Sequence, residues 1–145
     1  MKDFREELLG NFIFYTRFDT MSIPAHVGIQ RPTSEGQKEL IKELESELKA
    51  LGLSVEIEDN WALKGLLKGN KDGRCMAFMA HVDTSDDVMG NGVKAQVIEY
   101  EGGDISLPSG LVIKAEENPD LGCYVGTKIV TSDGTTLLGS DDKAG

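Results

Sequence analysis

A short apolar run, residues 75–80 (Cys-Met-Ala-Phe-Met-Ala), is the feature that most constrains how this chain can fold. Consecutive apolar residues without a charge suit a strand that is buried on both faces, as in the middle of an α/β sheet. Open α/β sheets carry their chemistry at the carboxyl ends of such strands. The run therefore predicts that the next residue, His81, lies at a functional edge of a sheet.

The residues that follow the run have the spacing His81-Val82-Asp83. In a His-x-Asp pair, one imidazole nitrogen can bind a metal ion while the other donates its proton to the carboxylate. The carboxylate then holds the ring in one tautomer and makes it a better ligand. The pair alone is a weak signal, because a histidine with a purely structural hydrogen bond has the same spacing. His81 and Asp83 are therefore candidates that need a second feature.

The rest of the chain predicts further helices and strands. Apolar residues at helical spacing predict an amphipathic helix over 2–15, and a capping-box pattern at Ser34 and Gln37 predicts a second helix over 35–50 that Gly52 closes. The other predicted segments are a hairpin over 53–68, a strand over 95–100, a mostly irregular stretch over 107–120, and two strands, 124–131 and 135–138, around a turn at 132–134. The predicted fold class is α/β, with a mixed β-sheet and flanking helices in one domain.

Composition excludes several classes of function. The net charge of −10 argues against a nucleic-acid or anionic-membrane partner, because both select a basic face. The N-terminal residues are charged, and no stretch approaches the roughly 20 apolar residues that span a bilayer. Cys75 and Cys123 fit no metal-ligand spacing and are expected to be buried free thiols in a reducing compartment. We therefore expect a cytoplasmic protein.

His26 lies in a predicted loop and is expected to be exposed.

A pair of carboxylates lies at the end of the chain, in Gly139-Ser140-Asp141-Asp142-Lys143-Ala144-Gly145. A histidine and a carboxylate suit zinc, and a carboxylate with both oxygens available can bridge two ions about 3.5–4 Å apart. The alternative is that the pair is an acidic helix N-terminus, where the helix dipole favours anions. Because no helix follows, we expect the sequence to be cut from a longer protein.

Two segments, residues 81–85 and 136–145, resemble the metal motifs of the tripeptide aminopeptidases in the dizinc M20 family of metallopeptidases. Three more matches follow the order of that family: residues 18–20 (Phe-Asp-Thr), 32–37 (Pro-Thr-Ser-Glu-Gly-Gln) and 100–105 (Tyr-Glu-Gly-Gly-Asp-Ile). The resemblance implies that residues 1–145 are the N-terminal portion of a zinc-peptidase catalytic domain. It implies, too, that the lid domain, which often mediates dimers, is absent.

The resemblance assigns a role to each matching residue. His81 resembles the histidine ligand of one zinc ion, and Asp83 resembles the catalytic-site carboxylate that orients this histidine. Asp141 resembles the carboxylate that bridges both zinc ions, whereas Asp142 is not expected to bind metal. The general base and the remaining ligands of the family have no counterpart up to Gly145. The implied reaction releases the N-terminal residue of a tripeptide, the small peptide substrate, through attack of a metal-activated water.

Two alternatives stay open. Another M20 enzyme, such as a dipeptidase or an N-acyl amino acid deacylase, would keep the metal site and change the substrate. A non-catalytic α/β module would use the same acids only for capping and solvation. The isolated chain is expected to be inactive, to bind zinc weakly and to self-associate. In the intact enzyme, His81 and Asp141 are expected at one edge of the sheet, with a cis peptide bond between Asp141 and Asp142.

Overall fold

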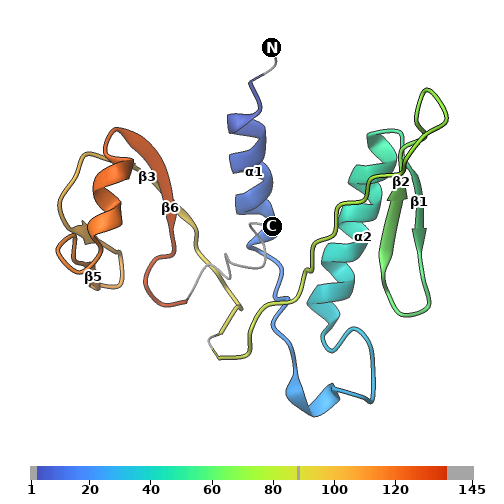
Figure 1. The fold of residues 1–145 in the computed structure, drawn as a ribbon. Helices are drawn as coiled ribbons and strands as arrows, with labels where there is room; N and C mark the ends of the chain where they lie inside the picture. The colour runs from blue at the N-terminus through green and yellow to red at the C-terminus, as the bar shows by residue number, and fades with distance from the viewer. Residues whose placement is uncertain (1–2, 88, 137–145) are drawn as a thin grey trace.

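The computed structural model describes residues 3–87 and 89–136, and Figure 1 shows two groups of elements on either side of one helix. This central helix is α1 (Arg5–Tyr15). One group contains η1 (Pro24–His26), α2 (Glu35–Ala50), β1 (Ser54–Ile57) and β2 (Leu63–Leu66). The other contains β3 (Gln96–Tyr100), β4 (Ile105–Ser106), β5 (Val112–Ile113), the 3-10 helix η2 (Pro119–Tyr124) and β6 (Thr127–Thr131).

Helix α2 begins and ends where the sequence predicts. Gln37 Oε1 accepts hydrogen bonds from the backbone N–H groups of Thr33 at 3.0 Å and Ser34 at 3.5 Å, as in the predicted capping box. At the other end, Gly52 has a φ of +85° and donates its N–H to the carbonyl of Lys49. A helix is confirmed at α1, from Arg5, but none of its residues is buried, so the predicted apolar face is not covered by other described residues. The residues that begin and end a helix are close to one another in the sequence. The ends of α2 can therefore be predicted from the sequence alone.

The predicted hairpin over 53–68 is also confirmed. Strands β1 and β2 are antiparallel, with Val55 opposite Gly65, and the hairpin packs against α2 (Figure 1). Gly65 allows this close packing, because a Cβ there would lie 2.9 Å from Leu53 Cδ2 and 3.1 Å from Leu48 Cδ1. The hairpin and α2 therefore form one layered unit.

The predicted mixed sheet is not formed by the residues that the structure describes. They form three separate two-stranded antiparallel sheets, β1–β2, β3–β6 and β4–β5, and one isolated parallel bridge between Met21 and Thr84. The fold is still a mixture of helices and strands. Strands β1 and β2, and strands β4 and β5, are close in the sequence, whereas β3 and β6 are separated by β4, β5 and η2. A mixed sheet would need strands that connect the two groups of elements, and the described residues form none.

The strand pairing predicted around the turn at 132–134 is wrong. Strand β6 pairs with β3, with Ile98 opposite Ile129, and residues 134–136 form a bend. β3 offers five residues that match the length of β6, and the bend leaves no strand directly after the turn. Residues 137 and 138 of the predicted partner lie outside the described part. The stretch 107–120, predicted as mostly irregular, contains β5 and the start of η2.

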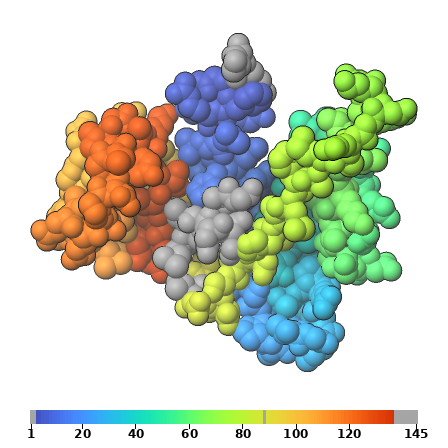
Figure 2. All heavy atoms as spheres, viewed as in Figure 1, coloured from blue at the N-terminus to red at the C-terminus, as the bar shows by residue number. Residues whose placement is uncertain are grey.

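The buried strand predicted over 75–80 is the largest correction. These residues form no strand, and Met76, Phe78 and Met79 are 79%, 91% and 100% exposed. Figure 2 shows the segment as a narrow yellow-green ridge along the surface. A strand hidden on both faces requires neighbours on both edges and layers above and below it. The described residues supply neither, so the apolar run has nothing to pack against.

The two cysteines are free, as predicted, but they are exposed rather than buried. Cys75 belongs to the uncovered run, and Cys123 lies in η2. The same absence of a covering layer explains the exposure of Cys75.

His26 differs from its prediction too. It lies in η1 and is half-buried, and its Nδ1 is 2.7 Å from the carbonyl oxygen of Thr33. A short loop that folds back on itself therefore covers a side chain that the sequence places in solvent.

Few apolar side chains are fully buried in the described residues. Leu40 and Ile41 of α2 are 3% and 5% exposed, and the other two buried apolar residues of the described part are Tyr100, at the end of β3, and Ile105, in β4. Tyr100 donates its hydroxyl to the carbonyl of Gly103 at 2.7 Å, which holds the turn between β3 and β4. Among the helices described, none is both long and apolar enough to cross a membrane.

Candidate metal site

His81 and Asp83 form the pair that their spacing predicts. Nδ1 of His81 lies 3.0 Å from Oδ1 of Asp83, and their side chains are 63% and 53% exposed. An ionised carboxylate can only accept a hydrogen bond. In such a pair the Nδ1–H group of His81 donates the hydrogen bond to Asp83, and the proton stays on the ring. Nε2 is then the ring nitrogen whose lone pair would coordinate a metal ion. The geometry fits a histidine ligand with its orienting carboxylate.

The other oxygen of Asp83 has a partner that is distant in the sequence. Oγ of Ser22 donates a hydrogen bond to Oδ2 of Asp83 at 3.1 Å. Both carboxylate oxygens are therefore engaged, one by the histidine ring and one by the serine. A carboxylate held at both oxygens cannot rotate freely, even though its side chain is half-exposed.

A backbone bridge brings Ser22 to this position. Thr84 donates its N–H to the carbonyl of Thr20 at 3.0 Å, and Ser22 donates its N–H to the carbonyl of Thr84 at 2.9 Å. These bonds form the parallel bridge between Met21 and Thr84. The loop after α1 therefore lies alongside the residues that follow His81.

The bridge is itself anchored to helix α2. Nε2 of Gln37, in the first turn of α2, donates to the carbonyl of Thr20 at 3.0 Å. Gln37 is 4% exposed, and the side chains of Thr20 and Thr84 are buried. A run of hydrogen bonds thus connects the helix start, the loop at 19–22 and the His81 segment. These bonds restrain the backbone next to the exposed pair, His81 and Asp83.

The described residues supply only part of the candidate metal site. No group of three or more histidine, cysteine, aspartate or glutamate side chains within residues 3–87 and 89–136 is placed to hold a metal ion. The predicted bridging ligand Asp141, and Asp142 beside it, lie outside the described residues. The expected approach of His81 to Asp141, and the expected cis peptide bond at 141–142, therefore remain predictions.

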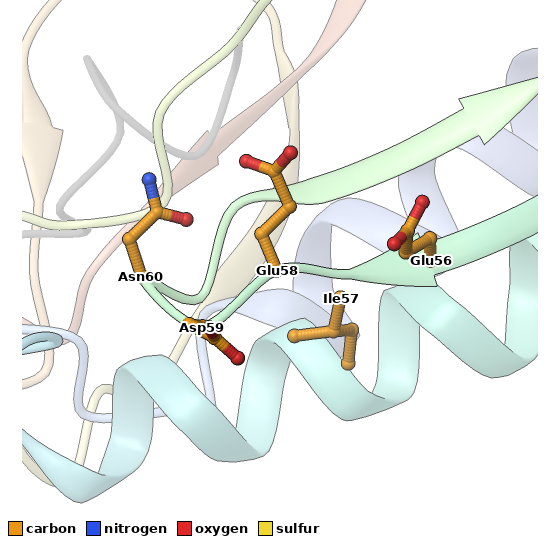
Figure 3. A pocket seen from close by; sticks show the side chains of 5 residues that line it. All are labelled: Glu56, Ile57, Glu58, Asp59 and Asn60. Atoms are coloured by element: carbon orange, nitrogen blue, oxygen red, sulfur yellow. The ribbon is translucent and has the colours of Figure 1, made fainter.

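An acidic pocket lies elsewhere on the chain. It is formed by the turn of the β1–β2 hairpin and is lined by Glu56, Ile57, Glu58, Asp59 and Asn60. Figure 3 shows Ile57 directed toward helix α2, whereas the Glu56 and Glu58 carboxylates point away from that helix. Glu58 forms an ion pair with Lys64 across the hairpin. The acids thus belong to a solvated turn.

Sequence reasoning identified His81 and Asp83 but missed Ser22. The local spacing of a His-x-Asp motif shows which residues can bond each other, whereas Ser22 is separated from Asp83 by 61 positions. The match over residues 18–20 ends two residues before Ser22 and offered the nearest signal. Only the parallel bridge reveals that the two segments lie together.

Comparison with known proteins gives the site its context. The chain is 44% identical over 144 residues to peptidase T of Shouchella clausii, covering 97% of this chain and 35% of that protein. It is 48% identical over 145 residues to peptidase T of Caldanaerobacter subterraneus, with 96% and 35% covered. It is 43% identical over 145 residues to peptidase T of Vibrio cholerae, with 97% and 35% covered. No protein-family model matches the chain.

These matches agree with the resemblance seen in the motifs. They extend across nearly all of the chain, and they involve proteins from separate bacterial genera under one name. The chain spans 35% of the length of these curated relatives. Over the part of their length that it spans, this chain belongs with the peptidase T proteins.

Proposed function

We propose that the protein containing this chain is a zinc-dependent aminopeptidase that releases the N-terminal residue of tripeptides. One observation carries the proposal: His81 is exposed and is hydrogen-bonded through Nδ1 to the Asp83 carboxylate. The chain that contains this pair matches peptidase T of Shouchella clausii over 97% of the chain's own length. This arrangement orients Nε2 as a metal ligand. The tripeptide preference and the zinc dependence rest on the family resemblance of residues 81–85 and 136–145.

The residues of this chain would take three roles. His81 would bind zinc through Nε2, and Asp83 would keep the ring in the tautomer that leaves this nitrogen unprotonated. Asp141 would bridge two zinc ions, in keeping with its match to the motif. Zinc bound there would polarise the substrate carbonyl and lower the pKa of a bound water.

A related activity is the main competing function. A dipeptidase or an N-acyl amino acid deacylase would use the same histidine and carboxylates on a different substrate. The full-length protein, loaded with zinc, should therefore be assayed on a tripeptide, a dipeptide and an N-acyl amino acid. We expect the largest kcat/KM on the tripeptide. A larger value on either other substrate would assign the competing activity.

The metal role is tested by substitution in the same full-length protein. We expect His81→Ala to abolish measurable hydrolysis and to weaken zinc binding, measured by competition with a chromophoric chelator. Asp83→Asn should weaken zinc binding by about 10- to 100-fold, the usual effect of removing the partner of a histidine ligand. His26→Ala is the matched control, because His26 lies in η1 and its Nδ1 contacts the backbone carbonyl oxygen of Thr33. Unchanged zinc binding in His81→Ala would instead support a non-catalytic module.

A further inference from the structure

We infer that Ser22 is a positioning residue for the metal site, acting through Asp83 on His81. This inference rests on the proposed function and extends it to a residue of the loop after α1. Three contacts carry it: Nδ1 of His81 to Oδ1 of Asp83 at 3.0 Å, Oγ of Ser22 to Oδ2 of Asp83 at 3.1 Å, and the N–H of Ser22 to the carbonyl of Thr84 at 2.9 Å.

The carboxylate of Asp83 needs such a restraint. Its side chain is 53% exposed, so packing alone does not hold it. An unrestrained aspartate two residues from a histidine could turn its oxygens to solvent or bind the metal ion directly, and the histidine would lose its orienting partner. The Ser22 hydroxyl occupies the oxygen that the ring does not use, so the carboxylate plane is fixed by donors on both sides. Ser22 thereby keeps Asp83 in its orienting role.

Ser22 is held in place by groups that do not belong to the site. Its backbone is fixed by the bridge to Thr84, and this bridge is anchored through Thr20 to Gln37 of helix α2. The hydroxyl therefore approaches Asp83 from a fixed point of the fold. A serine on a loop without such support would exchange its bond with water at little cost.

The test measures zinc affinity in the full-length protein by chelator competition. We expect Ser22→Ala to weaken zinc binding by about 3- to 10-fold, less than the loss of Asp83 itself, because the serine acts one contact further from the metal. Ser22→Thr keeps the hydroxyl and should retain affinity within about twofold. Ser46→Ala is the control, since Ser46 Oγ also donates a hydrogen bond, to the Lys42 carbonyl at 3.2 Å, on an exposed part of α2.

A double-substitution cycle separates positioning from general stability. If Ser22 acts through Asp83, Ser22→Ala should have no further effect on zinc affinity in an Asp83→Ala background. An equal loss in both backgrounds would overturn the inference, and so would full affinity in Ser22→Ala alone. Should the alanine variant fail to fold, Ser22→Cys, a near-isosteric weak donor, gives the same comparison with the same expected loss. Failure of the wild-type protein to bind zinc would instead refute the proposed function.

Discussion

The backbone of Gly36, in the first turn of α2, lies against the backbone of Asp19. A Cβ at position 36 would be only 1.9 Å from the Asp19 carbonyl oxygen. We therefore predict that Gly36→Ala destabilises the protein by about 1–3 kcal/mol, because a rigid backbone atom has to move. Gly10→Ala in α1 is the matched control, since a Cβ there meets nothing within 4 Å. It should stabilise the protein by about 0.5–1 kcal/mol in urea denaturation. Equal effects of both substitutions would contradict the close approach.

Thr20 belongs to the buried, hydrogen-bonded segment that supports the candidate site. Its side chain is 0% exposed, and its Oγ1 has no hydrogen-bond partner among the described residues. A buried hydroxyl without a partner costs free energy. We expect Thr20→Val to leave the free energy of unfolding unchanged or raise it by up to about 1 kcal/mol. Thr20→Ala, which also removes a buried methyl group, should lower it. Marked destabilisation by valine would show that the hydroxyl has a partner.

The contact between Tyr15 of α1 and Glu47 of α2 should make the free energy of unfolding decrease with increasing pH in the alkaline range. The Tyr15 hydroxyl donates to Oε2 of Glu47, and burial, followed by this hydrogen bond, raises the pKa of Tyr15 above its ordinary value. A group with a raised folded-state pKa contributes stability below its ordinary pKa and loses this contribution as pH increases. At neutral pH, Tyr15→Phe should therefore cost about 1 kcal/mol.

The difference between wild type and Tyr15→Phe should shrink as pH increases above about 10, the ordinary tyrosine pKa. Urea denaturation of both proteins at several pH values measures it. Tyr124→Phe is the control, because Tyr124 is 51% exposed in η2. A difference that stays constant with pH would show that Tyr15 keeps an ordinary pKa.

We propose that copies of the isolated 145-residue chain associate through the apolar run at 75–80. Phe78 and Met79 are 91% and 100% exposed, and contiguous apolar surface of this kind favours association. Sedimentation velocity should show oligomers whose population increases with concentration. The double substitution Phe78→Ser and Met79→Ser should reduce association, whereas Leu8→Ser, a change at an exposed leucine of α1, should not. A monomer at high concentration would refute this prediction.

The isolated chain should also lack peptidase activity and bind zinc weakly. A catalytic zinc ion normally has three protein ligands, and this chain offers His81 and, by its motif, Asp141. A missing general base alone costs about two to four powers of ten in rate. A tripeptide assay with added zinc, run on the chain and on its His81→Ala variant, checks the expectation. Hydrolysis that disappears with the substitution would show that the chain builds its own site.

Local signals in the sequence determined the elements that depend on neighbouring residues. The capping pattern at Ser34 and Gln37 and the glycine at 52 define helix α2, and the His-x-Asp spacing predicts the bond between His81 and Asp83. In each case the interacting groups are a few positions apart. Their geometry follows from the helix or the extended backbone itself, so no knowledge of distant segments is needed.

Tertiary structure alone decided the features that join distant segments. The pairing of β3 with β6, the bridge between Met21 and Thr84, and the Ser22–Asp83 hydrogen bond all depend on where loops return, which no local pattern encodes. Tertiary structure also decided the exposure of residues 75–80. Apolar residues make burial of the segment favourable, but burial takes place only where other strands and helices cover the segment.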